Sequence, residues 1–162
     1  MTSFIDRTSD ADLVSLLVAS DDAVIVADPG GTIRFWNAAA EGMFGHPAGE
    51  AVGSSLDLII PEKLRERHWA GYRTVMQTGE TAYAGRMLAV PALRADGSRI
   101  SVEFTVTLLT DAAGAVTGIG AIVRDVTERW EERRALQAKV RALEDELAAL
   151  RHAAATRPGG RS

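Results

Sequence analysis

Residues 23–45 read AVIVADPGGTIRFWNAAAEGMFG, and they decide the fold because they join a hairpin directly to a capped helix. Two runs rich in β-branched and aromatic residues, 23–28 and 32–37, flank a Pro-Gly-Gly break, which predicts a β-hairpin. Asn37 is suited to cap the following helix, because its side-chain oxygen accepts a bond from a free backbone amide, and Gly45 is suited to end it. The sequence therefore predicts a two-stranded unit that leads at once into a short helix.

Further helices are predicted on both sides of this unit. Residues 8–20 are expected to form an N-terminal helix, since apolar residues recur there at helical spacing. Residues 46–60 combine turn residues with a short apolar run, which predicts irregular chain with single helical turns. Pro61 is suited to the first turn of a longer helix that runs to about Gln77 and is stopped by the Thr-Gly pair after it.

Beyond these helices the hydrophobic period changes to two, which is typical of β-strands. Three such runs follow, at 83–93, 99–109 and 115–126, separated by turns that contain Asp and Gly. Pro91 lacks the amide that a central strand needs, so the first run is expected at a sheet edge or with a bulge. Together with the hairpin, the runs predict an α+β fold with one five-stranded antiparallel sheet, helices on one face and a C-terminal coiled-coil helix.

The final helix is predicted over 127–152 and is followed by a tail at 153–162 that is expected to be disordered. We divide the rest into an N-terminal helix at 1–20 and a globular domain at 21–126. Apolar residues in the final helix are spaced by four, three, four and three, which is the spacing of a coiled-coil seam over about two heptads. This spacing predicts a homodimer through the C-terminal helix. The seam residues are Leu136, Val140, Leu143, Leu147 and Leu150.

Composition narrows the possible functions. Apolar residues make up 46% and charged residues 25% of the 162 residues, as in an ordinary soluble globular protein. There is no cysteine, which excludes disulfides, zinc–thiolate sites, iron–sulfur clusters, thiol nucleophiles and cysteinyl-flavin photochemistry. The net charge is −4, and residues 1–123 hold nine Lys and Arg against fifteen Asp and Glu, which argues against nucleic acid as a partner.

Membrane and enzyme classes find no support in the sequence. The apolar runs are too short to cross a bilayer and no signal peptide is evident, so we expect a cytoplasmic protein without a membrane partner. The acidic pairs between residues 128 and 146 alternate with arginine on the C-terminal helix, which is typical of a solvated surface. Because the sequence lacks a phosphate loop, a nucleophile elbow and a metal-hydrolase pair, we expect no enzymatic activity.

Three stretches, in this order, resemble a PAS sensor domain of the S-box type. They are AVIVADPGGTIRFWNAAAEGMFGHPAGEAVG at 23–53, LRADGSRISVEFTVTLL at 93–109 and GIGAIVRDVTER at 118–129. The resemblance covers roughly residues 10–129 and implies that the domain at 21–126 is a sensor. It specifies the fold more closely than the ligand, because PAS domains bind many ligands or none.

Residues 61–98 resemble, more closely, the haem-binding PAS domains of bacterial oxygen-sensor kinases. PEKLRERHWAGYRTVMQTGE, at 61–80, matches their pattern without a gap, and His68 falls where that family keeps its proximal haem ligand. The resemblance therefore implies that haem b binds through His68, and that the domain senses oxygen, another gas or redox state. The change would be relayed through the C-terminal coiled coil.

His68 also has an interpretation from the residues alone. On the predicted helix, Leu64, His68 and Tyr72 recur on one apolar side, and the small neighbours Ala70 and Gly71 are expected to leave room for a flat macrocycle. A neutral imidazole directed into an apolar cavity is a good iron ligand. The alternative is a histidine at the edge of the apolar side that is hydrogen-bonded to a carbonyl. We count Tyr72 with His68 among the cofactor-binding candidates.

The strands supply four further cofactor-binding candidates. By the resemblance, the relatives keep an oxygen-binding arginine at the position of Leu88, and some have a methionine ligand where this chain has Arg86. Either Arg86 takes over the oxygen contact, or the pocket serves another gas or redox state, or no haem binds. Phe104 and Val106 are expected to form an apolar distal wall, with plain sheet core as the alternative.

The choice of ligand and partner stays open at this point. Thr74 and Ala82 stand where the relatives keep basic partners for the haem propionates, which is a second departure from the pattern. Flavin ranks below haem, because light-sensing relatives need a cysteine and the cavity side offers only the amides of Asn37 and Gln77. The sequence is also compatible with a cofactor-free dimerisation module and with a domain that binds a small apolar molecule. No kinase, cyclase or DNA-binding module follows, so we expect an unknown downstream signalling protein as partner, or an excised input module.

Overall fold

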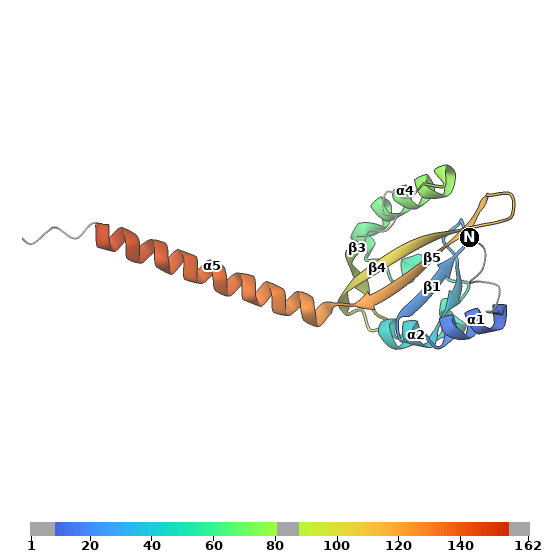
Figure 1. Cartoon of the computed structure of the whole chain (residues 1–162), viewed down its shortest axis with the longest axis horizontal. Coiled ribbons are helices and arrows are strands. Elements are labelled where there is room, and N and C mark those ends of the chain that lie inside the picture. The colour runs from blue at the N-terminus through green and yellow to red at the C-terminus, as the bar shows by residue number, and fades with distance from the viewer. Residues whose placement is uncertain (1–8, 81–87, 156–162) are drawn as a thin grey trace, which may run out of the picture. The chain divides into compact units, whose positions relative to one another are not determined.

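The computed structural model describes residues 9–80 and 88–155, and the chain divides into two compact units, Met1–Val126 and Thr127–Ser162. The sheet and helices α1 to α4 belong to the first unit, and helix α5 forms the second (Figure 1). The first part of the strand predicted at 83–93 and most of the predicted tail lie outside the described residues.

One antiparallel sheet of five strands, in the order β2-β1-β5-β4-β3, forms the centre of the first unit. The predicted hairpin is confirmed, and Ile25 of its first strand lies opposite Trp36 of its second. The last strand pairs with the first, with Ala23 opposite Val123, so the end of the sheet lies beside its beginning. The strands are β1 (Ala23–Ala27), β2 (Ile33–Trp36), β3 (Leu88–Leu93), β4 (Arg99–Thr110) and β5 (Val116–Asp125).

Strand β3 lies at the edge of the sheet, as its proline predicts. Pro91 is opposite Ser101 of β4, and the register continues unbroken on both sides of this pair. The edge position is therefore confirmed and no bulge is present, because Pro91 needs no ladder partner on the open side of an edge strand.

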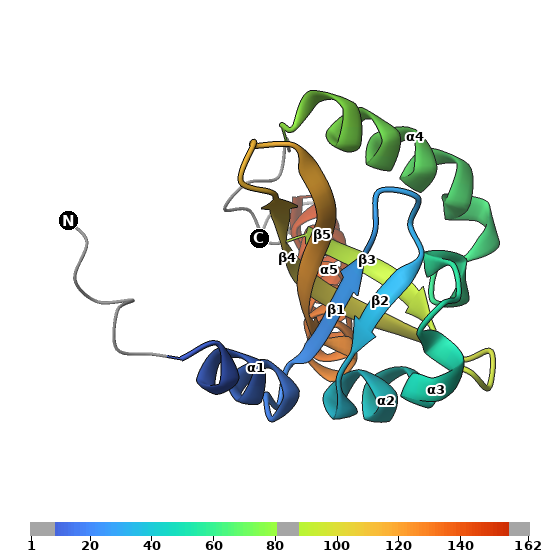
Figure 2. The ribbon, with the colours of Figure 1, turned by 90° about the vertical axis from the view of Figure 1, so that its right-hand side faces the viewer.

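The helices α2, α3 and α4 follow one another around one side of the sheet (Figure 2). Asn37 caps α2 by accepting a 3.0 Å hydrogen bond from the amide of Ala40, and Gly45 ends the helix with a φ of 75°. Both predicted caps are confirmed. The helical elements are α1 (Asp10–Val18), α2 (Ala38–Phe44), α3 (Ala48–Ala51), the 3-10 turn η2 (Leu56–Leu58) and α4 (Glu62–Thr78).

The hydrophobic core lies between these helices and the inner face of the sheet. Ile33 and Phe44 are completely buried, and the ring of Trp36 packs against Phe44 with centroids 5.3 Å apart. Burial of one such large side chain stabilises the fold by about 1.5–3 kcal/mol. The core is completed by Ala23, Ile25, Ala27, Ala40, Ala51, Leu56, Tyr72, Ala92, Ile100, Val102 and Val123.

The predicted N-terminal helix is present as α1, but it contributes no buried side chain. Ser9 and Asp12 form a capping box at its start, which accounts for the position of its first turn. Its apolar residues are between 41% and 69% exposed: Leu13, Val14, Leu16, Leu17 and Val18.

Helix α5 (Thr127–Ala155) extends three residues beyond the end predicted at 152 and has no buried residue. Every residue of the predicted coiled-coil seam is on this helix and exposed. In the part of the chain that the structure describes, no helix is long and apolar enough to span a membrane.

Candidate functional site

Helix α4 carries His68 and shows which of its sides faces the core. Tyr72 is buried, and Leu64 and His68 are half-buried, so the apolar side predicted from the spacing is present. Ala70 and Gly71 are exposed, and a Cβ added to Gly71 would meet nothing within 4 Å. The expectation that these two small residues make room for a macrocycle is wrong, because they lie on the solvent side of the helix.

The imidazole of His68 is packed among aromatic rings. Its centroid lies 4.9 Å from the Trp69 ring in an edge-on contact and 5.7 Å from the Tyr72 ring. Burial lowers the pKa of His68 below its usual value, although the nearby Asp57 carboxylate opposes this. The Nδ1 atom is buried and has no hydrogen-bond partner within residues 9–80 and 88–155. His68 is thus held as a neutral imidazole with one unused ring nitrogen, which is the state that binds a metal ion.

Tyr72 anchors α4 to the turn between β1 and β2. Its hydroxyl donates a 2.6 Å hydrogen bond to the backbone carbonyl of Asp28, and burial raises the pKa of the phenol to about 12. The Asp28 carboxylate in turn accepts from the amides of Gly30 and Thr32, so it holds the turn in shape. Tyr72, which was predicted to bind a cofactor, serves here as a structural contact between helix and hairpin.

Trp69 makes a second anchor that no local sequence pattern indicated. Its indole Nε1 donates a 2.8 Å hydrogen bond to the carboxylate of Asp57, in η2. Its ring also lies so close to Gly31 that a Cβ there would stand 2.2 Å from the indole, and Gly31 has a φ of 81°. A glycine in a turn and an aromatic residue on a helix were visible in the sequence, but their meeting depends on the packing of the whole fold.

Strand β4 places its two candidate residues on the inner face of the sheet. Phe104 and Val106 are half-buried while Thr105 and Thr107 are exposed, and Phe104 packs against the core that includes Tyr72. The backbone of Leu88 pairs with that of Phe104 at the start of β3. The predicted role of Arg86 falls on a residue outside the described part of the chain.

Of the two amides considered for a flavin, Asn37 is buried and used within the fold, whereas Gln77 is exposed. Asn37 is only 3% exposed, and its side-chain oxygen accepts from the amide of Val24 as well as capping α2. Its amide nitrogen donates to the carbonyls of Leu17 and Asp22, which ties the end of α1 to the sheet. Gln77 is exposed near the end of α4. Asn37 is therefore a fully used structural residue.

A second histidine resembles His68 in one respect. His46, in the loop after α2, also has a buried ring nitrogen without a hydrogen-bond partner, its Nε2. Its backbone carbonyl accepts a 3.0 Å hydrogen bond from the indole of Trp36, so this segment is fixed to the core. Each of the two histidines thus has one unused imidazole nitrogen, but only His68 lies among the aromatic rings of α4.

The last strand is fixed at its C-terminal end by two ion pairs. Arg124 binds the carboxylate of Asp22, before β1, with N–O distances of 2.7 and 2.9 Å. Arg94 binds Asp125 at 2.9 Å. These contacts fix the point at which the chain leaves the sheet.

The comparison with known families decides the classification. The family described as the PAS fold matches residues 17–131. The chain belongs to the PAS fold family. The resemblance seen in the hairpin, the following helix and the last strands is therefore confirmed, and the PAS domain is a sensory fold.

Similar curated proteins come from three bacteria. An uncharacterized protein of Azorhizobium caulinodans is 41% identical over 130 residues, which cover 80% of this chain and 17% of that protein. The sensor protein FixL of Bradyrhizobium diazoefficiens is 30% identical over 141 residues, with 87% and 27% covered. The oxygen sensor protein DosP of Escherichia coli K12 is 26% identical over 122 residues, with 75% and 15% covered. The matches span between 15% and 27% of these relatives.

Solved structures support the PAS fold alone, since their identity to this chain is low. The PAS domain of a protein from Colwellia psychrerythraea has a TM-score of 0.65 at 19% identity, with 73% of this chain and 97% of that chain covered. An RNA-binding light-oxygen-voltage receptor has a TM-score of 0.68 at 23% identity, with 80% and 36% covered.

Proposed function

We propose that this PAS domain binds haem b through His68 and senses oxygen, another gas or redox state. The observation that carries the proposal is the buried Nδ1 of a neutral His68, which no group of the described residues uses. Leaving a buried polar nitrogen without a partner costs about 1–3 kcal/mol, and a metal ion bound there would offset that cost. The similarity to a protein named an oxygen sensor supports the same function.

Each residue of the proposed haem site would have its own role. Haem iron, when bound, supplies the gas-binding and redox-active centre. His68 would hold it, the rings of Trp69 and Tyr72 would fix the imidazole, and Phe104 and Val106 would keep water from the apolar side. The oxygen contact considered for Arg86, two residues before Leu88, stays a prediction, because Arg86 lies outside the described residues. We propose that strand β5 passes the change on to α5, which follows it directly in the chain and pairs with a second copy.

The test is an absorption spectrum of protein produced with haem precursor present. We expect a Soret band that is lost or shifted in His68→Ala and unchanged in His46→Ala. His46 is the matched control, since it also has a buried ring nitrogen without a partner. A wild-type protein without a Soret band, or equal spectra for both variants, would contradict the proposal.

A cofactor-free PAS dimerisation module is the second candidate. It is favoured by the exposed Thr74, which stands where the haem-binding relatives keep a basic propionate partner, and by the packing role of Tyr72. This candidate predicts colourless protein whose dimer is lost on polar substitution of Leu143 and Leu147. Native mass spectrometry would separate it from a domain that retains flavin or a small apolar molecule, since only the latter two gain mass.

A further inference from the structure

Helix α5 presents a continuous apolar stripe that none of the described residues of its own unit covers. The five seam residues are between 47% and 63% exposed, and the helix buries none of its residues. A strictly spaced stripe of this kind is the seam of a coiled coil, but the stripe alone does not decide what covers it. The charges beside the seam indicate which partner covers it.

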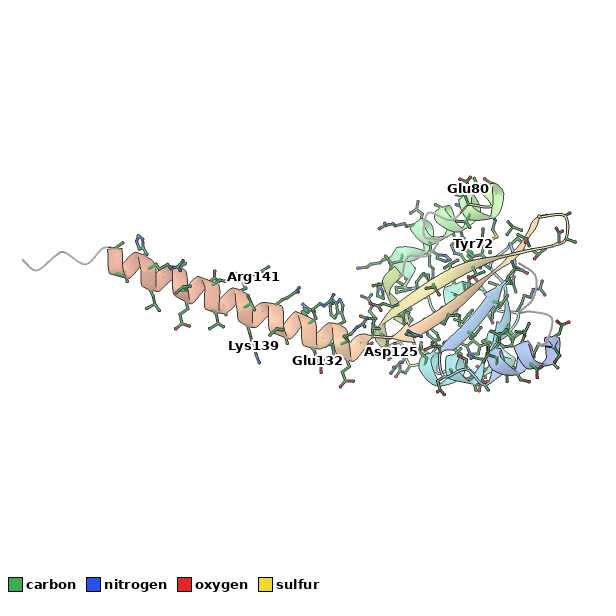
Figure 3. The ribbon with its side chains drawn as sticks, in the orientation of Figure 1. Tyr72, Glu80, Asp125, Glu132, Lys139 and Arg141 are labelled. Carbon is green, nitrogen blue, oxygen red and sulfur yellow. The ribbon has the colours of Figure 1, made fainter. Side chains whose placement is uncertain are left out.

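In the heptad fixed by Leu136 and Val140, four flanking positions between residues 139 and 151 carry charges, two of each sign. Lys139 and Glu146 precede seam residues Val140 and Leu147, whereas Glu144 and Arg151 follow Leu143 and Leu150. Figure 3 shows Lys139 on the same side of α5 as Glu132, seven residues earlier, and Arg141 on the opposite side. In the heptad, Lys139 stands at a position that flanks the stripe, and Arg141 stands at an outer position.

A parallel pair of α5 helices brings these flanking charges into favourable contact. In a parallel two-stranded coil, the residue before a seam position faces the residue five places later on the other helix. Lys139 then faces Glu144 of the second copy, and Glu146 faces Arg151 of the second copy. Each contact forms twice in a homodimer, and all four pair opposite charges.

Antiparallel pairing is less favourable in both registers that match the seam layers. With Val140 opposite Leu143, only Lys139 and Glu146 of the second copy attract each other, and four apolar layers form instead of five. With Leu143 opposite Leu147, Glu144 lies beside Glu144 and Glu146 beside Glu146 of the second copy. Both contacts repel. Within a parallel coil, a β-branched Val140 with leucine at the neighbouring seam positions favours two strands over three or four.

We propose that the partner of this surface is a second copy of the chain, bound through α5 in parallel and in register. This proposal rests on the homodimer of the proposed function and adds its orientation, its register and the extent of the seam. The seam is apolar from Leu136 to Leu150, and the same spacing continued backwards reaches Arg133 and then Arg129.

The two arginine layers limit the closed part of the dimer. In a parallel pair, Arg133 faces Arg133 and Arg129 faces Arg129, so like charges oppose each other in the layers closest to β5. The coil is therefore closed over about two heptads in the C-terminal part of α5 and opposed by charge at its start. A pair of sensor domains can then move relative to each other without breaking the apolar seam.

The absence of cysteine makes orientation directly measurable. Single substitutions Leu136→Cys and Leu150→Cys place identical thiols opposite each other only in the parallel register, within the Cα separation of about 4.4–6.8 Å that a disulfide needs. We expect both full-length variants to form a covalent dimer on mild oxidation, and Asp145→Cys, on the outer side, to form none. Sedimentation of the unmodified chain reports whether a dimer exists at all.

The outcomes separate this inference from the proposed function. A dimer in which Leu136→Cys fails to cross-link, while a mixture of Leu143→Cys and Leu147→Cys chains does, is antiparallel and overturns the inference but leaves the homodimer. A monomeric chain overturns both. Haem binding is read independently from the absorption spectrum.

Charge reversal tests the register without cysteine. Glu146→Arg should weaken self-association about tenfold, because Arg151 of the second copy then repels it, and adding Arg151→Glu should restore it. Neither residue has a charged neighbour three or four places away on its own helix, so the restoration must come from the second copy. If the double variant associates as weakly as Glu146→Arg, the parallel register is wrong.

Arg133→Leu tests the extent of the seam. It adds one apolar layer and removes one repulsive layer, so self-association should tighten about tenfold, whereas Arg141→Leu, away from the seam, should leave it unchanged. Equal behaviour of the two variants would contradict the assignment of Arg133 to the seam.

Discussion

Helices α4 and α5 both show an apolar stripe in the sequence, yet the fold uses them in different ways. The apolar stripe of α4 packs within its own unit, where Tyr72 is 7% exposed and Trp69 is hydrogen-bonded to Asp57. The stripe of α5 is left open along its length. The difference lies in chemistry as well as burial, because α4 carries polar rings that find partners and α5 carries only aliphatic side chains at its seam.

The comparison indicates where each kind of function resides. A helix that is pinned by specific hydrogen bonds can hold one imidazole in a fixed place, as a ligand site requires. A helix with an aliphatic stripe and flanking charges is suited to association with another helix. Substitutions in α4 should therefore change the stability of the folded domain, whereas those in α5 should change only association.

The largest expected effect is that of Tyr72→Ala. Removing a buried aromatic side chain costs about 3–5 kcal/mol in the free energy of unfolding, through lost transfer energy and the cavity left behind. The matched change in the other helix, Leu143→Ala, should leave the unfolding of the first unit unchanged, since Leu143 is 63% exposed. Urea denaturation followed by tryptophan fluorescence measures both. A similar loss in the two variants would remove the distinction between the helices.

Gly31→Ala should cause the next largest loss of stability, because the added methyl group disturbs the packing of Trp69. The new methyl group would meet the indole at 2.2 Å in a residue with a φ of 81°, which costs about 1–2 kcal/mol for the backbone and about 1–3 kcal/mol for the clash. Gly114→Ala is the matched control, since Gly114 has a φ of 82° but nothing within 4 Å of the added atom. Thermal denaturation should show a lower Tm for Gly31→Ala than for Gly114→Ala. Equal Tm values would mean that the Trp69 ring can move aside without loss of stability.

The contrast between the two helices also shows which features could be predicted from the sequence. The caps of α2 at Asn37 and Gly45, and the buried side of α4 at His68, follow from chemistry within a few residues, and all three were predicted. The bond from Tyr72 to Asp28 joins residues 44 positions apart, so no local pattern contains it. For the same reason Tyr72 was assigned to a cofactor rather than to the hairpin.

The prediction for α1 shows a second limit. Periodicity and composition indicate a helix there, and the helix forms with its capping box. Whether an apolar helix is covered depends on its partners in space, and the leucines of α1 remain exposed. Hydrophobic spacing thus predicts the helix but not its burial, as α5 also shows.

Alkaline titration gives a third, smaller effect that belongs to α4 alone. Burial raises the pKa of Tyr72 to about 12 from a usual 10.0, so the folded state holds this proton more tightly than the unfolded chain. The resulting stability is complete below pH 10 and is lost as the pH rises through 12. Denaturation series across this range should show a decline that is smaller in Tyr72→Phe. An identical decline in both proteins would assign the loss to other groups.

The smallest expected effect tests the ion pair at the end of the last strand, from which α5 continues. Arg124 and Asp22 are bound at 2.7 Å but are 60% and 31% exposed, so solvent screens them and Asp22→Asn should cost only about 0.2–1 kcal/mol. The hydrogen bond from Arg124 lowers the pKa of Asp22 below 3.8, so this contribution is present near neutral pH and fades as the pH falls through the lowered value. Asp21→Asn removes a neighbouring charge as the matched control and should cost less.

Because the pair of Arg124 and Asp22 joins β5 to the start of β1, its loss should loosen strand β5 without changing α4 or the seam of α5. Hydrogen exchange should then rise at β5 in Asp22→Asn but not in Asp21→Asn, and an equal rise in both would show that Arg124 does not fix the strand through Asp22.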